Sequence, residues 1–533
     1  MDYSVLIPSA GLGTRLGVSY KNLNKALVTI DNKPVISHII EKFPLETKTV
    51  IALGHKANLL KDYLKIAHKD RNISFVHIDK YCGVGSGLGY TILQCKKLLQ
   101  CPFIFSPNDT YVVEDIPPPN FNWLGFAEIE NDEKYRSLKI SESNIVEHIY
   151  EKEDLLSKKN KPYIGLAGIN DYKEFWEAME NGKNYGSINI GESYAIKSLI
   201  KDKAIFKAKE FTWYDTGNLD CLEKAKKEFK REDSPEILDK QNEAIWFVNK
   251  KVIKYSKDTN FIKGRVERAR LLKGFVPKVE DKNTNMYSYT EITGKVMSKI
   301  SNKNNFRDLL FFLNDFWEEI DLPKIEREKF HENCLNFYKK KTADRLDLYF
   351  SKYSESDSTE IINGLVIPPV NDLCKMINWK KLSEGIATRI HGDLHFENIL
   401  MKETGSFCLL DWRQDFGGII EFGDKYYDLA KLLHGLIVSH ELINKNHYFL
   451  SKSDEIITLD FYRKNILVEN EYQLVDYVNN NGLDIIKVKL LTSLIYINIA
   501  PLHHHPYSQF LFYLGKYNLY KTITENKKSN LFL

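Results

Sequence analysis

The chain has few cysteines, little net charge and no long apolar run, and each of these features excludes a class of protein. The 533 residues include seven cysteines, and an odd number without metal-type spacing argues against a disulfide framework or a zinc site. The 75 basic and 72 acidic residues leave a net charge of only +3, so no strong field indicates a nucleic-acid partner. No apolar run reaches the ~20 residues that span a bilayer, and the chain enters a strand pattern without a signal peptide. We therefore expect a reduced, cytoplasmic protein without membrane insertion.

The strongest chemical signal lies between Ile390 and Leu400, together with Leu410-Asp411-Trp412. Asp393 and Asn398 stand five residues apart between apolar residues, and Asp411 ends an apolar run. Phosphoryl transfer from ATP uses such a set, because one carboxylate orients and deprotonates a hydroxyl while an amide and a second carboxylate hold Mg²⁺ on the phosphates.

A second candidate site lies near the N-terminus, in the loop from Gly11 to Arg15. Its two glycines permit a tight turn whose amide hydrogens can approach phosphate, and Arg15 and Lys25 can neutralise the phosphate charge. A Gly-x-Gly pair alone is equally compatible with an ordinary strand-to-helix turn. Asn108-Asp109 strengthens the phosphate interpretation, because it ends a strand where α/β sheets place ligands.

The two sites belong to two expected domains, because the chain is too long for a single core. Residues 1–232 alternate short apolar runs with helical patterns, which predicts an α/β domain with a mixed, mostly parallel sheet. Residues 240–533 predict an α+β, two-lobed arrangement like that of protein kinases. The small lobe, about 240–295, contains a hairpin around Asn249-Lys250, and the lobe from about 296 to 533 is helical.

Residues 1 to about 230 resemble the sugar-1-phosphate nucleotidyltransferases, which have a GT-A-like, Rossmann-type fold. The Gly-x-Gly-Thr-Arg-Leu opening, the later lysine at 25, Lys33-Pro34 and the segment from Trp213 to Gly217 all match. Gly17 stands where the family usually has proline, so the family pattern does not determine the loop shape or the choice of base. The resemblance implies Asp109 and Asp215 as Mg²⁺ ligands, Arg15 and Lys25 as catalytic residues on the nucleotide phosphates, Gly11, Leu12, Gly13 and Thr14 as nucleotide-binding residues, and Glu151, Lys152 and Gly165 as sugar-binding residues.

Residues from about 240 resemble the aminoglycoside phosphotransferase and choline kinase superfamily. The motif His391-Gly392-Asp393 with Asn398, followed by Asp411, carries the resemblance. It implies Asp393 as the catalytic base and Asn398 and Asp411 as Mg²⁺ ligands. Lys254 and Glu267 would form the ion pair that positions the ATP phosphates, although an ordinary surface lysine and helix glutamate would look the same.

Two further residues bear on this second site. Many relatives carry an acid two residues after the metal-binding aspartate, where this chain has Arg413. We expect Asp428, in Tyr-Asp-Leu-Ala, to hold the catalytic loop in place.

Together the two resemblances imply a bifunctional enzyme that phosphorylates a small hydroxyl substrate with ATP and then caps the phosphate with a nucleotide from CTP, UTP or GTP. A sugar substrate would give a nucleotide sugar for bacterial capsule, lipopolysaccharide or wall synthesis. Choline or ethanolamine would instead give a CDP-alcohol. The sugar-side motifs favour the first route, and the kinase motif leans towards the second. Enzymes of the first family often self-associate, so a homo-oligomer is compatible with the resemblance.

Overall fold

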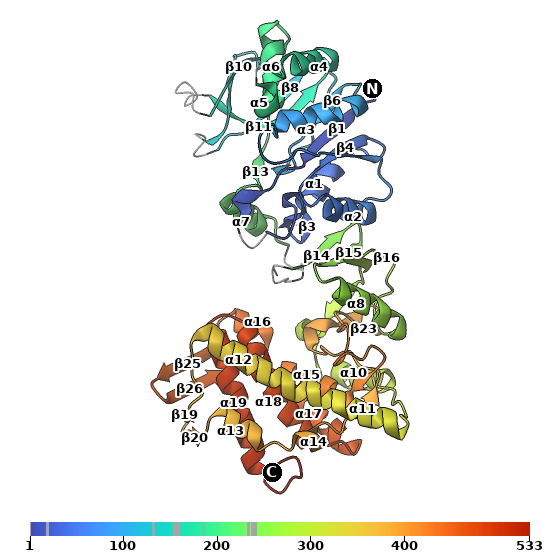
Figure 1. The fold of residues 1–533 in the computed structure, drawn as a ribbon, viewed down its shortest axis with the longest axis vertical. Helices are drawn as coiled ribbons and strands as arrows, with labels where there is room; N and C mark the ends of the chain where they lie inside the picture. Colours follow the sequence, from blue (N-terminus) through green and yellow to red (C-terminus); the bar gives the residue numbers. More distant parts are fainter. Residues whose placement is uncertain are drawn as a thin grey trace. The chain divides into compact units, whose positions relative to one another are not determined.

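The computed structural model describes residues 2–17, 21–129, 134–152, 160–184, 186–231, 235 and 242–533, and these form two compact units. Unit 1 comprises Met1–Thr259 and Glu280–Glu291, and unit 2 comprises Asn260–Val279 and Ile292–Leu533. Figure 1 colours unit 1 mainly blue to green and unit 2 mainly yellow to red. The predicted boundary at 233–239 lies, apart from Pro235, outside the described residues.

Unit 1 is built on a mixed α/β sheet of nine strands, as the sequence predicts. Its centre is parallel, because β1 (Ser4–Ser9) pairs with β4 (Lys48–Leu53) on one side and β6 (Phe103–Phe105) on the other. The order along the main path is β10-β9-β11-β6-β1-β4-β5, with antiparallel pairing from β6 outwards on the β11 side. Parallel strands of this kind need cover on both faces.

The residues of β1 show how that cover arises. Val5 and Ile7 pack in one core cluster with residues of α1 and α2, whereas Leu6, which points the other way, packs in a second cluster with residues of α3, α4 and α6. The elements of the unit are β1 Ser4–Ser9, η1 Thr14–Leu16, η2 Lys25–Leu27, β2 Thr29–Ile30, β3 Lys33–Pro34, α1 Val35–Glu41, β4 Lys48–Leu53, α2 Ala57–Ala67, β5 Ile73–His77, α3 Leu88–Cys95, η3 Lys96–Leu98, β6 Phe103–Phe105, β7 Thr110–Val112, β8 Trp123–Phe126, β9 Ser137–Ile140, β10 Val146–Tyr150, β11 Lys161–Ile169, α4 Tyr172–Asn181, α5 Ser187–Ile190, α6 Glu192–Lys201, β12 Lys207–Glu210, β13 Trp213–Asp215, α7 Leu219–Glu228, β14 Glu243–Val248, β15 Lys251–Ser256, β16 Asp281–Lys282 and β17 Met286–Thr290.

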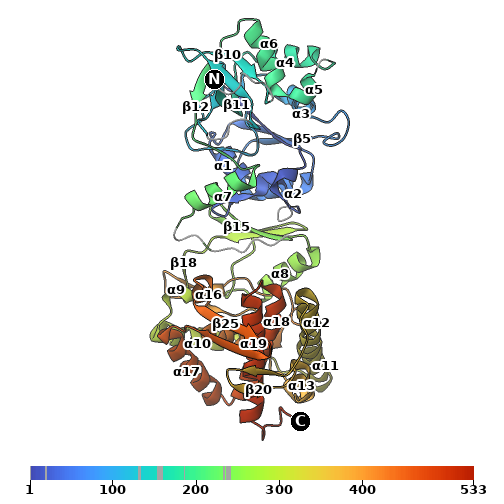
Figure 2. The same ribbon diagram turned by 90° about the vertical axis from the view of Figure 1, so that its left-hand side faces the viewer.

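The expected hairpin around Asn249-Lys250 is present as β14 and β15, but its four-stranded sheet groups with unit 1. Trp246 of β14 is buried in the same core as Val5 and meets the ring of Tyr63 edge-on, with centroids 5.0 Å apart. Figure 2 shows β15 beside α2, the helix that carries Tyr63. Contacts therefore divide the chain after residue 259, whereas the sequence places the boundary near 232–240. That earlier boundary stays a prediction about domain identity.

Unit 2 mixes helices with short strands. Helices α15, α18 and α19 pack together, and α11 and α12 form one long helix in Figure 1, joined by the π-helical turn η6. The small antiparallel sheet β18-β22-β23 carries the catalytic-type loop at its edge. The elements of the unit are α8 Thr259–Leu271, β18 Gly294–Val296, α9 Met297–Ile300, α10 Lys303–Phe316, α11 Lys324–Leu335, η6 Asn336–Lys340, α12 Lys341–Tyr353, β19 Glu360–Ile362, β20 Leu365–Ile367, α13 Val370–Lys375, α14 Trp379–Leu382, β21 Ala387–Thr388, η7 Phe396–Asn398, β22 Ile399–Lys402, β23 Phe407–Leu409, β24 Gly423–Asp424, α15 Lys425–Ile437, α16 His440–Asn444, β25 Tyr448–Ser453, β26 Ile456–Phe461, α17 Asn465–Asn480, α18 Ile485–Ile499, η8 Ala500–Leu502 and α19 Tyr507–Glu525.

One stretch of the described chain, Ile485–Leu502, is long and apolar enough to cross a membrane by length and composition. Two thirds of it, 67%, is buried inside the structure. It contains α18, which packs against α15 and α19, and a core helix has the same composition.

Candidate active sites

In unit 1, four charged residues converge where two neighbouring strands end. The loop from Gly11 to Arg15 follows β1, and Asp109 follows β6, which is the parallel neighbour of β1. The Nζ atom of Lys25 lies 2.9 Å from Asp109 Oδ2, and Arg15 lies 3.6 Å from the same oxygen. Arg15 also reaches Asp215 at 3.8 Å. The structure therefore brings together the two predicted metal ligands and the two predicted phosphate-binding cations.

The two aspartates of this cluster differ in their electrostatics. Burial alone would raise the pKa of Asp109, but the charges of Lys25 and Arg15 outweigh it and lower the pKa. The pKa of Asp215 is raised, first by burial and then by the charge of Asp109. Two carboxylates crowded in this way favour a cation between them.

Two glycines allow the charged side chains of this cluster to lie close together. A Cβ atom at Gly217 would lie 2.5 Å from Asp109 Oδ2 and 3.1 Å from Arg15, so any larger residue would displace the cluster. Gly13 has a φ of +69° and lies against the side chain of Lys25, 2.9 Å from the position a Cβ would take. Gly11, Leu12 and Thr14 are exposed in the same loop, where their backbone can meet a ligand.

Of the three residues predicted to bind a sugar, Glu151 already pairs with two cations. Glu151 accepts from Arg136 Nε at 2.8 Å and from Lys197, so two cations orient its carboxylate. Gly165 interrupts β11 with a φ of +80° at a register shift, and its Cα faces Pro107. Lys152 is exposed. Their binding of a sugar stays a prediction.

In unit 2, a buried carboxylate fixes the backbone of the predicted catalytic loop. Asp428 of α15 accepts from the amides of His391 at 2.8 Å and Gly392 at 2.7 Å, and also from Trp317 Nε1. The role expected for Asp428 is thus confirmed. His391 then bonds the carbonyl of Leu410 at 2.7 Å, which ties the loop to the segment that carries Asp411.

Asp393 lies between two cations. Lys431 Nζ is 2.9 Å from its Oδ1 atom, and His395 lies 3.7 Å from Oδ2. Burial would raise the pKa of Asp393, but Lys431 and His395 hold it well below its usual range. Burial would likewise lower the pKa of His395, but Asp393 and Glu397 raise it to about 9. Asp393 is therefore a stable anion that can orient a hydroxyl and accept its proton late in the reaction.

The predicted metal ligands of unit 2 lie on two chain segments that are hydrogen-bonded to each other. The amide nitrogen of Asn398 donates to the carbonyl of Asp393 at 2.9 Å, which leaves the amide oxygen as its metal-binding atom. Asp411 follows β23 with a φ of 59° and pairs with Arg265 of α8 at 3.2 Å. Leu410 donates to the carbonyl of Asn398 at 2.7 Å, so the two ligand-bearing segments are held together.

Magnesium fits both donor sets, since it prefers oxygen ligands and is usually held by one or two carboxylates together with substrate phosphates. In unit 1 the candidate ligands are the carboxylates of Asp109 and Asp215, which share Arg15 as a counter-ion. In unit 2 Asn398 and Asp411 supply one amide and one carboxylate. Within the described residues, no group of three or more histidine, cysteine or acidic side chains is arranged to hold a metal.

Lys254 and Glu267 fall in different units of the structure. Lys254 lies on β15 of unit 1, where it is buried and close to the ring of Tyr289, whereas Glu267 lies on α8. Their pairing around ATP stays a prediction.

The sequence motifs did not indicate several residues of the two sites. Lys431 is one helical turn beyond Asp428, and this spacing is the only signal in the sequence that could have indicated it. Tyr135, which donates to Asp215 at 2.9 Å, has no such signal. No signal in the sequence indicates Arg136, Lys197 or Arg265 either.

Comparison with known proteins finds relatives for part of the chain. No protein-family model matches it. It is 27% identical over 214 residues to the bifunctional protein GlmU of Methanococcus vannielii, covering 39% of this chain and 49% of that protein. For GlmU of Methanocaldococcus jannaschii, identity is 28% over 222 residues, or 40% and 50% of the two chains. The chain thus spans about half the length of the curated relatives it matches.

Solved structures give matches of similar extent. A UDP-glucose pyrophosphorylase complexed with UDP-glucose is 22% identical and covers 43% of this chain and 98% of its own, with a TM-score of 0.37. The CTP:phosphocholine cytidylyltransferase from Streptococcus pneumoniae is 17% identical and covers 43% and 100%, with a TM-score of 0.36. The N-terminal region of the chain resembles sugar-1-phosphate nucleotidyltransferases.

Proposed function

We propose that the chain catalyses two consecutive reactions. In the first, the site of unit 2 transfers the γ-phosphoryl group of ATP to the hydroxyl of a small substrate. In the second, the site of unit 1 transfers a nucleotidyl group from a nucleoside triphosphate to that new phosphate and releases pyrophosphate. The phosphate made by one site is the nucleophile required by the other.

The convergence of Arg15, Lys25, Asp109 and Asp215 is the observation that carries the second reaction. An oxygen of the substrate phosphate attacks the α-phosphorus of the triphosphate, and the bond to the β-phosphate oxygen breaks. The nucleophile is already anionic, so the site needs charge neutralisation and in-line placement more than proton transfer. Arg15 and Lys25 supply positive charge, and magnesium held by the two aspartates would neutralise the phosphates further.

The first reaction is supported by the arrangement around Asp393. This carboxylate is held as an anion by Lys431 and His395, and two oxygen donors, from Asn398 and Asp411, stand on segments tied to the same loop. Asp393 would orient the substrate hydroxyl and take its proton, and magnesium at Asn398 and Asp411 would hold the ATP phosphates.

Within this scheme we favour a sugar as the substrate and a nucleotide sugar for surface polysaccharide as the product. The matches of Glu151, Gly165 and the Trp213–Gly217 segment to sugar-binding enzymes support it, and so does the similarity to GlmU proteins. A choline or ethanolamine kinase joined to a cytidylyltransferase is the alternative, and it rests on the kinase motif.

Phosphorus NMR of the purified chain tests the proposal directly. The protein is incubated with Mg²⁺, ATP, CTP, UTP and GTP, and with pooled sugars or pooled amino alcohols. A diphosphodiester signal that appears only with sugars is expected, and omission of single nucleotides then names the base. The same signal only with amino alcohols and CTP establishes the alternative. Absence of both ADP and diphosphodiester with every substrate contradicts the two-reaction proposal.

A further inference from the structure

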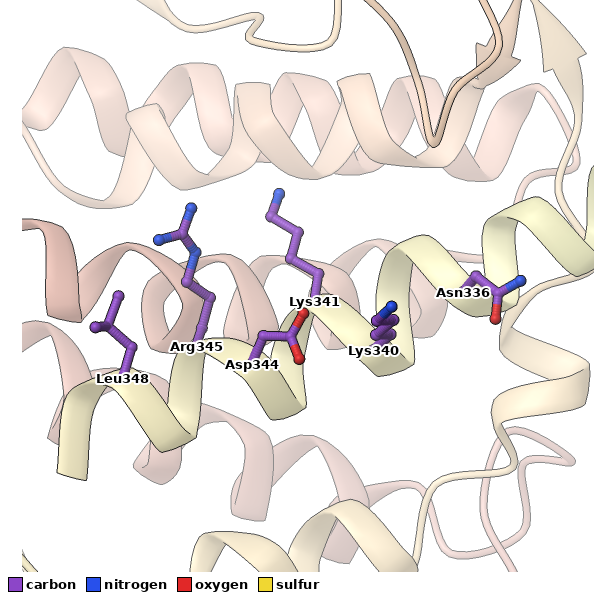
Figure 3. A pocket seen from close by; sticks show the side chains of 6 residues that line it. All are labelled: Asn336, Lys340, Lys341, Asp344, Arg345 and Leu348. Carbon is purple, nitrogen blue, oxygen red and sulfur yellow. The ribbon is translucent and has the colours of Figure 1, made fainter. Parts of the chain in front are cut away.

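A cluster of positive side chains lies beside the candidate kinase site, and the two reactions as described do not use it. Lys341 and Arg345 stand one turn apart on α12 and line a cavity of about 490 Å³. Figure 3 shows their side chains extending to the same side of the helix. Three of the six lining residues are basic and one is acidic; the six are Asn336, Lys340, Lys341, Asp344, Arg345 and Leu348.

A chain of side-chain contacts connects this cavity to Asp393. Lys341 donates to the hydroxyl of Tyr427 at 3.1 Å, and its Nζ atom lies 5.4 Å from the centre of that ring. Tyr427 and Lys431 are one turn apart on α15, and Lys431 is the residue that pairs with Asp393. Tyr427, which contacts Lys341 of the cavity, and Lys431, which pairs with the candidate base, therefore lie on the same face of α15.

Arg413 joins the cluster from the other side. Its guanidinium lies 5.3 Å from the centre of the Phe337 ring, and the Nζ atom of Lys341 lies 4.5 Å from the same centre. Its side chain also packs on Gly392, where an added Cβ would be 2.8 Å from Arg413 Cδ. Gly392 directly precedes Asp393, so Arg413 stands next to the reacting centre.

The one carboxylate that lines the cavity, Asp344, offsets these cations only in part, although its charge acts to raise the pKa of Arg345. None of the ion pairs found among the described residues involves Lys341, Arg345 or Arg413, whereas Lys431 is paired with Asp393. Burial lowers the pKa of both Lys341 and Arg345, and the neighbouring charge of Arg413 lowers each further. Burial would raise the pKa of Tyr427, but the surrounding cations lower it to about 8. The cavity therefore has a positive potential.

We propose that the substrate phosphorylated by unit 2 carries a negatively charged group, a carboxylate or a phosphate monoester, which binds among Lys341, Arg345 and Arg413. This inference rests on the kinase activity proposed above and names the class of its substrate. A sugar acid or a sugar phosphate fits the cluster, because arginine and lysine pair with such groups through charge-assisted hydrogen bonds. A quaternary ammonium alcohol is repelled by it.

The transfer step is the same for any such acceptor. The acceptor hydroxyl gives its proton to Asp393, and its oxygen forms a bond to the γ-phosphorus of ATP. The bond from the γ-phosphorus to the oxygen that bridges to the β-phosphate breaks, and ADP leaves with that oxygen. The bound anionic group takes no part in the step and fixes the position of the hydroxyl.

Matched sets of acceptors test the inference with the full-length protein, Mg²⁺ and ATP. ADP release is compared for neutral hexoses, the corresponding uronic acids, the corresponding hexose 6-phosphates, and choline, ethanolamine and hexosamines. We expect kcat/KM at least tenfold higher for an anionic acceptor than for its neutral partner, and the two anionic sets separate carboxylate from phosphate. Equal or better turnover of neutral or cationic acceptors overturns the inference and leaves the kinase proposal standing. If none of the acceptor sets gives ADP release, both this inference and the kinase proposal are overturned.

Single variants show whether the cluster binds the acceptor. Lys341→Gln and Arg345→Gln should each raise KM for the anionic acceptor by at least tenfold, with KM for ATP unchanged. Lys339→Gln, an exposed residue of the same helical turn that does not line the cavity, is the matched control. Because Arg345 is only partly buried, its variant still reports if Lys341→Gln fails to fold. A rise in KM for ATP, with KM for the acceptor unchanged, would assign the cluster to the nucleotide and overturn the inference.

Discussion

At the residue scale, the function proposed for unit 1 depends on two cations, Arg15 and Lys25, that face the neighbouring carboxylates of Asp109 and Asp215. A Cβ added at Gly13 would lie 2.9 Å from Lys25 Cβ, and Lys25 Nζ lies 2.9 Å from Asp109 Oδ2, so the charge of Lys25 is held between the Gly11–Arg15 loop and Asp109. A residue fixed in this way contributes to catalysis by being placed before the substrate arrives.

The change Lys25→Met tests this role. We expect nucleotidyl transfer to a supplied sugar phosphate to fall by at least ~100-fold, because one preorganised charge on the reacting phosphates is removed. ADP formation by unit 2 should be unchanged, which is measured in the same preparation. Lys65→Met, an exposed lysine of α2, serves as the control. Nucleotidyl transfer within threefold of the wild-type rate would remove Lys25 from the mechanism.

At the element scale, the hairpin of β14 and β15 is joined to α2 through its turn. Asn249 and Lys250 have φ values of 50° and 57°, and the Asn249 side chain donates to the carbonyl of Ala67 at 2.9 Å. Asparagine tolerates this left-handed backbone better than other residues with a Cβ. The turn therefore serves both the hairpin and its attachment to unit 1.

Two substitutions in that turn should change the free energy of unfolding of unit 1 in different directions. Asn249→Ala loses the hydrogen bond and the tolerance of positive φ, and we expect it to lower the free energy of unfolding of unit 1 by about 1–2 kcal/mol. Lys250→Gly relieves a positive φ and should leave stability unchanged or raise it. Thermal unfolding followed by tryptophan fluorescence compares the two variants. Equal destabilisation by both would contradict the importance of the turn conformation.

A buried histidine, His68, and a partly buried one, His38, make the same region sensitive to acid. Burial lowers the pKa of His68 to about 3 and that of His38 to about 4, and like charges nearby add to both shifts. His68 bonds Ser37 Oγ at 2.8 Å, and His38 bonds the carbonyl of Ile30 at 3.2 Å. Their unfolded pKa is near 6.5, so the unfolded state binds more protons than the native state below that pH. Stability must therefore fall as the pH drops below 6.5.

At pH 5 each histidine should cost on the order of 2 kcal/mol of stability relative to pH 8. Thermal unfolding of the wild type and of a His38→Gln, His68→Gln double variant measures the effect. The wild-type unit 1 transition should move to lower temperature on acidification by more than that of the double variant. Identical shifts in the two proteins would show that other groups dominate.

At the scale of the whole molecule, each of the two units carries one candidate site with its own charged groups. Asp109 and Asp215 lie in unit 1, while Asp393 and Asp411 lie in unit 2, and each set has its own cationic partners. Each of these ion pairs joins residues of a single unit. The two activities should then be separable.

Mixing two inactive variants tests that separation. The Lys25→Met chain retains the kinase site, and the Asp393→Asn chain retains the nucleotidyltransferase site. A mixture of the two full-length proteins should form the diphosphodiester, detected by phosphorus NMR, after a lag in which phosphorylated substrate accumulates. Each variant alone should form less than a hundredth as much. A mixture as inactive as its components, with each single activity intact, would indicate that the intermediate cannot leave one chain and enter another.

The sequence by itself determined a good part of this protein. The alternation of apolar runs predicted the α/β sheet of unit 1, and the Asn249-Lys250 pair predicted its hairpin, because both depend on local periodicity and turn chemistry. It also placed Asp109 at the end of a strand, and Asp428 as the support of the catalytic-type loop, since strand ends and helix faces follow from short-range spacing.

Only the tertiary structure decided which groups balance those charges and where the units divide. Tyr135, Arg136, Lys197 and Arg265 reach their carboxylate partners across 15 to 146 positions of the chain, and no periodicity encodes such a distance. The β14–β17 sheet groups with unit 1 because Trp246 is buried against Tyr63, a contact between residues far apart in the sequence. The positive cavity near Asp393 arises in the same way. Pairings at short range are fixed by local backbone geometry, whereas pairings at long range depend on how whole elements pack.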